Sequence, residues 1–96
     1  MSPLNKKKLK KVRNKLDKLD TKLLRLIKIR TNLVNEVLKL KTHKKDIIDK
    51  KRINLILKKI KHKSLLINID PKITNRIWKN MILSYIDFEK RNFKKK

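Results

Sequence analysis

The chain has 96 residues, 31 of them lysine or arginine and eight aspartate or glutamate, so its formal net charge is +23. It has no cysteine, which excludes disulfides and thiolate metal sites, and its two histidines have no ligand motif around them. No apolar stretch reaches the length of about 20 residues that a membrane span needs, and no apolar signal-peptide core follows the first lysines. We therefore expect a soluble, cytoplasmic protein with no metal, and a chain this small is expected to self-associate.

The high charge has two explanations. A basic chain normally indicates nucleic-acid binding, because neutralising phosphates dominates such affinity. However, the chain has 25 Lys, 13 Ile and 9 Asn but no Gly or Ala, which is the composition expected from an A+T-rich genome. The lysines are spread along every segment, and only four aromatic residues are present to stack on bases. We therefore expect nucleic acid not to be the main partner, and keep a basic helical nucleic-acid-binding protein as the alternative.

Apolar residues at alternating steps of three and four predict one long helix from about Lys7 to Lys41. The members of this line, called here the apolar seam, are Leu9, Val12, Leu16, Leu19, Leu23, Leu26, Leu33, Val37 and Leu40. A seam of more than four heptads is typical of a helix that packs along its length against a partner. Residues 1–7 are predicted to be a frayed basic tail, 8–91 a helical domain, and 92–96 a second basic tail.

Arg30 interrupts the apolar seam once. A guanidinium among Leu and Val residues needs an anionic partner, because an unpaired buried charge is strongly unfavourable. This position favours a role for Arg30 in ligand binding. The alternative is that its side chain reaches out to water or pairs with a nearby acid such as Glu36.

Two further helices are predicted after a short polar connection through Thr42–Asp46. The second begins near Ile47 or Ile48 and ends around Lys63. The third begins at Asp70 and Pro71, an N-cap followed by proline at the first helical position. With no competing strand pattern, the fold class is all-α, with three helices and a long first member.

Helix geometry indicates which cations can act together. Arg30 and Lys41 are 11 residues apart, so they return to nearly the same face at a separation of about 16 Å. Arg13 lies about 25 Å before Arg30 and about 100° round the helix. Arg13 therefore needs a second chain in order to join the same site.

These residues resemble the first helix of the all-helical chorismate mutases, in the run from Leu19-Asp20 through Arg30 to Lys41. The continuation Asp49-(x2)-Arg52, and later Ile69-Asp70-Pro71, is similar to the rest of that domain. The resemblance covers about residues 5–90. It implies an intertwined homodimer that converts chorismate to prephenate without a cofactor, in aromatic amino-acid biosynthesis.

The resemblance also implies roles for individual residues. Arg30 and Arg52 would bind the two substrate carboxylates, with Arg13 of the other chain, and Asp49 would hold the substrate hydroxyl. Lys41 and Glu89 would act at the ether oxygen, where negative charge develops as the bond breaks. The implied catalytic residues are Lys41, Glu89 and Arg30, and the implied substrate-binding residues are Arg13, Arg30, Lys41, Asp49, Arg52 and Tyr85.

The chain departs from the family pattern at three positions. Ile53 stands where the family usually has a glutamate that binds the substrate hydroxyl, and Tyr85 stands where it has serine. Glu89 stands where the family usually has glutamine, although some members carry glutamate there. A catalytically weakened member with a structural or regulatory role is therefore a further alternative. Alternatively, Arg13 and Arg52 are solvated cations on the helix surface, and Asp49 interacts with the N-terminus of the second helix.

Overall fold

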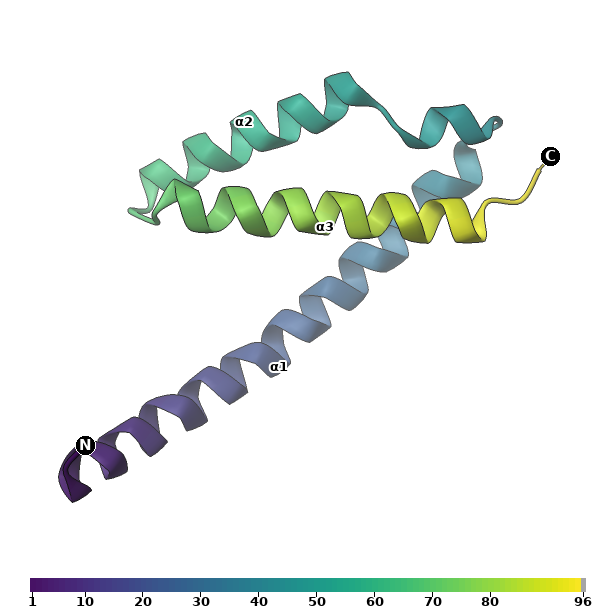
Figure 1. The fold of residues 1–96 in the computed structure, drawn as a ribbon. Helices are drawn as coiled ribbons and strands as arrows, with labels where there is room; N and C mark the ends of the chain where they lie inside the picture. The colour runs from purple at the N-terminus through teal and green to yellow at the C-terminus, as the bar shows by residue number, and fades with distance from the viewer. Residues whose placement is uncertain (96) are drawn as a thin grey trace. The chain divides into compact units, whose positions relative to one another are not determined.

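The computed structural model describes residues 1–95, which form helices and connections without a strand. The elements are α1 (Pro3–Leu40), the short 3-10 helix η1 (Lys44–Ile47), α2 (Lys50–Leu66) and α3 (Pro71–Asn92) (Figure 1). The prediction of an all-α chain with three helices and a long first member is confirmed. The chain divides into two units, Met1–Leu33 and the residues from Val34 onward.

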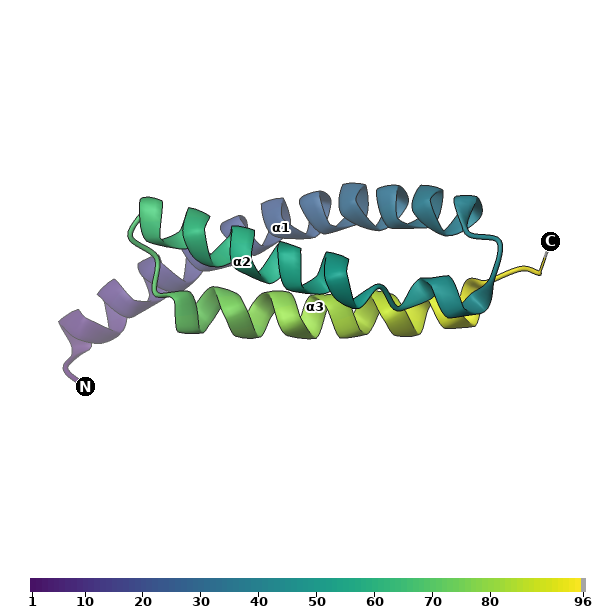
Figure 2. The ribbon, with the colours of Figure 1, turned by 90° about the horizontal axis from the view of Figure 1, so that it is seen from above.

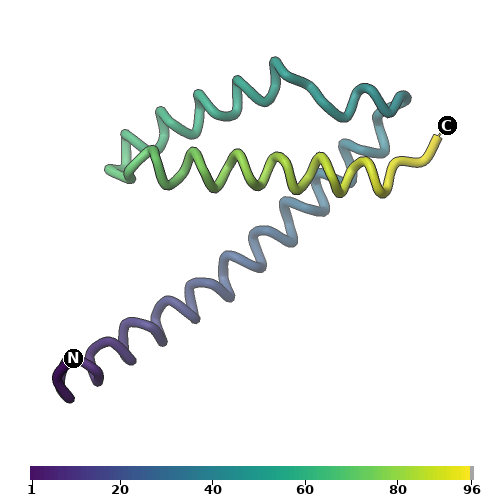
Figure 3. Tube along the Cα trace, in the orientation of Figure 1, coloured from purple at the N-terminus to yellow at the C-terminus, as the bar shows by residue number. Residues whose placement is uncertain are grey.

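The first helix begins earlier than predicted. Residues 1–7 were expected to be a frayed tail, but α1 already starts at Pro3 and follows a regular helical path (Figure 3). The Ser2 hydroxyl accepts a hydrogen bond from the Asn5 amide at 3.2 Å, and Pro3 occupies the first helical position. A capping side chain followed by proline starts a helix without any apolar periodicity, whereas the apolar seam that predicts this helix begins only at Leu9.

The first unit is a single stretch of α1 with its apolar seam largely open to solvent. Leu16 and Leu23, for example, are 51% and 47% exposed. A lone helix has no second element against which to bury such a face, and most helix stability in proteins comes from that burial. The first unit therefore presents an apolar line that lacks a covering surface within the unit.

The second unit contains a helical hairpin in which α2 and α3 run side by side in opposite directions (Figures 1 and 2). Near the turn that joins them, the hydroxyls of Ser64 and Thr74 are both buried and lie 2.8 Å apart. Ser64 also donates to the carbonyl of Ile60 at 2.6 Å. These small side chains let the two helices approach closely while their polar atoms stay hydrogen-bonded.

The helix starts in this unit differ in how well they were predicted. The second helix was expected near Ile47 or Ile48, but Ile47 ends η1 and α2 starts at Lys50, with Asp49 as its N-cap. The predicted start of α3 is confirmed, because Asp70 accepts from the Lys72 amide at 2.9 Å. Within residues 1–95, no helix is both long enough and apolar enough to cross a membrane.

Candidate active site

Lys41 and Glu89 form an ion pair inside the second unit. The Lys41 Nζ lies 3.0 Å from Glu89 Oε1, although the two residues are 48 positions apart in the sequence. Their side chains are only 18% and 8% exposed. Glu89 comes from the last turns of α3, and Lys41 follows the last residue of α1. Tertiary packing thus holds a cation and a carboxylate together in a largely dry environment.

The short helix η1 supplies a second partner for Lys41. The Lys41 Nζ donates to the carbonyl oxygen of Ile47 at 3.5 Å. Ile47 is 4% exposed, and η1 contacts α3, so this carbonyl is anchored by a buried side chain. The turn is closed by Asp46, whose carboxylate accepts from the His43 amide at 3.3 Å. Sequence reasoning missed this support, because a main-chain carbonyl has no residue signature.

The two contacts leave Lys41 with capacity for another oxygen. An ammonium group has three N–H donors, and the contacts to Glu89 and Ile47 use two of them. The third is available to an oxygen of a bound molecule. A positioned cation of this kind stabilises negative charge that develops at a nearby atom.

Asp49 and Arg52 are joined through the start of α2. One oxygen of Asp49, Oδ1, accepts from the Arg52 backbone amide at 3.0 Å. Asp49 is thus the N-cap residue of α2. Its contact in the structure is the one expected from the alternative interpretation, in which Asp49 is a partner of the N-terminus of the second helix. The side chains of both residues are exposed, and neighbouring Ile53 is partly buried.

The remaining predicted site residues lie on α1 and α3. Arg13 and Arg30 belong to the first unit, where Arg13 is exposed and Arg30 is partly buried. Tyr85 is partly buried on α3, one turn before Glu89. The structure therefore brings Lys41 together with Glu89, and Asp49 together with Arg52. Among the residues that it describes, no cluster of three His, Asp or Glu side chains is arranged for a metal ion.

Comparison with known proteins identifies the family. A family model described as chorismate mutase type II matches residues 12–90, which is most of the chain and includes every candidate site residue named above. The comparisons with curated proteins and with solved structures gave no match.

Proposed function

Since the chain belongs to the chorismate mutase type II family, we propose that it rearranges chorismate to prephenate. The observation that supports this activity best is the Lys41–Glu89 pair, which holds an ammonium group 3.0 Å from a largely buried carboxylate. Both residues lie within the matched region, at the positions that the resemblance assigns to the ether oxygen. We place the enzyme in cytoplasmic aromatic amino-acid biosynthesis.

The rearrangement is intramolecular, so the site needs to position the substrate and stabilise charge. Lys41 would donate to the ether oxygen with its third N–H, since negative charge builds there as the C–O bond breaks. Arg30 and Arg52 would clamp the two carboxylates and hold the substrate in its reactive, folded shape. Asp49 would bind the hydroxyl through Oδ2, because Oδ1 caps α2.

We propose that the active form is an intertwined homodimer. The seam residues of the first unit, such as Val12 and Leu26, are 52% and 61% exposed, and apolar surface of this kind is unfavourable in water. A second copy presents the same seam and would cover it through a two-fold interface. The partner's α1 would also supply Arg13, which geometry keeps away from Arg30 of the same chain.

Dimerisation makes folding depend on protein concentration. We expect sedimentation to show dimers at low micromolar concentration, and we expect the thermal midpoint to fall on dilution, because dissociation exposes the seam. Replacing Leu16 and Leu23 by Glu should prevent the dimer by placing charges in the seam. A folded monomer with unchanged stability on dilution would contradict the dimer and the shared site.

The proposed reaction is tested by adding chorismate and following its ultraviolet absorbance. Saturable, protein-dependent loss of chorismate with formation of prephenate would support the proposal. No turnover by a correctly folded dimer would favour the structural or regulatory alternative, for which Ile53 in place of the family glutamate is the specific observation. The variant Ile53→Glu restores that carboxylate, and its turnover of chorismate would then be measured.

Glu89→Gln should raise turnover at neutral pH. An ionised Glu89 neutralises Lys41 and repels the negative charge that develops on the ether oxygen, whereas a glutamine donates a hydrogen bond to it. We expect kcat/KM of the glutamine variant, measured with chorismate at neutral pH, to exceed that of the wild type.

Asp87→Asn is the matched control for this change. It also removes one carboxylate from α3, but Asp87 pairs with Arg91 at 2.9 Å on the exposed face, where both side chains are mostly solvated. Surface pairs of this kind contribute little, so we expect kcat/KM to be unchanged. A Glu89→Gln variant that is slower than wild type at neutral pH would show that Glu89 does not face the ether oxygen.

A further inference from the structure

Lysine side chains line a groove between α2 and α3, near the turn that joins the two helices. The groove has a volume of about 360 Å³, and its walls are Leu57, Lys58, Lys61, Pro71, Lys72 and Asn75. A second hollow of about 410 Å³ lies beside it on α2 and shares Lys58. The second hollow is lined by Lys58, Lys59, His62 and Lys63. Both helices therefore contribute positive charge to one continuous surface, called here the lysine groove.

The charge of this region is locally unbalanced. Residues 50–86 contain ten lysines and arginines but one acid, Asp70, whereas the rest of the chain has 21 such cations and seven acids. The Asp70 carboxylate is already used to cap α3. The ion pairs Lys41–Glu89 and Arg91–Asp87 include none of these ten cations. The other acids of the hairpin, Asp87 and Glu89, lie in the last turns of α3, about 18 to 21 Å from Asn75 along the helix axis, so they do not balance the charge of the groove.

The charge also determines what can occupy the lysine groove. A second copy of the chain carries the same positive surface, so association of two copies through the groove is electrostatically disfavoured. The occupant must be an anion, and a surface with many cations over two helices suits a polyanion better than a single small one. No aromatic side chain lines the groove, so stacking on bases does not contribute there.

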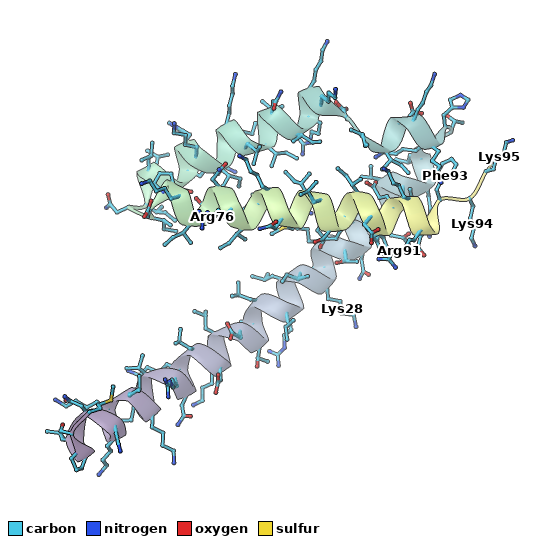
Figure 4. The ribbon with its side chains drawn as sticks, in the orientation of Figure 1. Lys28, Arg76, Arg91, Phe93, Lys94 and Lys95 are labelled. Atoms are coloured by element: carbon cyan, nitrogen blue, oxygen red, sulfur yellow. The ribbon has the colours of Figure 1, made fainter. Side chains whose placement is uncertain are left out.

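We propose that the lysine groove binds the phosphodiester backbone of nucleic acid without sequence preference. Arg76, at the same end of α3, would extend the positive surface (Figure 4). The surface includes no residue of the proposed chorismate site. Asn75 and Glu89 are 14 residues apart on α3, about 21 Å along the helix axis, and Lys58 lies about 9 Å beyond Arg52 on α2 and about 120° round that helix. Binding of nucleic acid and turnover of chorismate can therefore be tested independently.

The test compares two triple variants that have the same net charge. Lys58→Gln/Lys61→Gln/Lys72→Gln removes three cations from the groove. The control, Lys11→Gln/Lys18→Gln/Lys28→Gln, removes three exposed lysines of α1, of which Lys28 is labelled in Figure 4. Binding of a short fluorescent duplex DNA of mixed sequence is measured by anisotropy across a range of salt concentrations.

We expect the groove variant to bind at least tenfold more weakly than the control at about 50 mM salt. We also expect the slope of its plot of log Kd against log salt concentration to be smaller by about 2 to 3, because each phosphate contact contributes about 0.9 to that slope. Chorismate turnover should be the same in both variants. Equal loss in the two variants would show that net charge alone attracts the DNA and would overturn the proposal. Binding to anionic vesicles without binding to the duplex would also overturn it.

Discussion

Replacing Lys41 by Met should abolish most turnover while leaving a folded protein. Loss of one positioned charge-stabilising donor typically lowers kcat by about 10²- to 10³-fold, and Lys41 is the cation that we assign to the ether oxygen. The same change leaves Glu89, whose side chain is 8% exposed, without its ion-pair partner. We therefore also expect the free energy of unfolding to fall by about 1 to 3 kcal/mol, as measured by urea denaturation.

A double variant separates these two effects. In Lys41→Met/Glu89→Gln the carboxylate charge is removed together with its cation, so stability should recover most of the way towards wild type. Turnover should remain far below that of Glu89→Gln alone, because the Lys41 ammonium group that we assign to the ether oxygen is still missing. If the double variant is as active as Glu89→Gln alone, Lys41 is structural and its assignment to the reaction fails.

Arg30→Ala should cost at least about 100-fold in kcat/KM, because a bidentate, charge-assisted contact to a carboxylate is worth about 3 kcal/mol or more. The fold should remain intact, because alanine is a good helix former at this position within α1. Kinetics with chorismate and thermal unfolding of the same samples give both results.

Two further variants give this experiment its controls. Arg30→Met keeps the length and apolar stem of the side chain, so it should preserve the dimer and remain as inactive as Arg30→Ala. Arg30→Lys keeps the charge but loses the planar pair of donors, and it should restore activity only in part. If the alanine and methionine variants both unfold, Arg30 supports the fold and the proposed carboxylate clamp is wrong.

The Ile47 carbonyl and the Asp49 cap place constraints on the proposed mechanism. Lys41 is held from two sides, by a main-chain oxygen and by a carboxylate, so its remaining donor has a restricted direction. Asp49 contributes one oxygen to the start of α2, so it would contact the substrate hydroxyl with the other. The same local structure that begins α2 would therefore orient part of the proposed site.

Local signals in the sequence determined the helices. The seam predicted α1 because its three-and-four spacing is a property of consecutive residues, and Asp70-Pro71 predicted the start of α3 for the same reason. The predicted starts of α1 and α2 differ from the observed ones, because a capping side chain and a short 3-10 turn set these starts, and apolar periodicity does not. The Ser2–Pro3 start and the turn that ends at Ile47 are the two cases.

The candidate site required more than local signals. The resemblance pointed to Lys41 and Glu89 as separate positions, but their ion pair joins residues 48 apart and depends on η1 contacting α3. The Ile47 carbonyl has no side-chain identity that a sequence pattern could detect, and only the turn geometry turns it towards Lys41. The sequence by itself therefore determined the helices and the chemical groups that they carry. The tertiary structure decided which of those groups meet, because long-range contacts depend on packing between segments and not on neighbours in the chain.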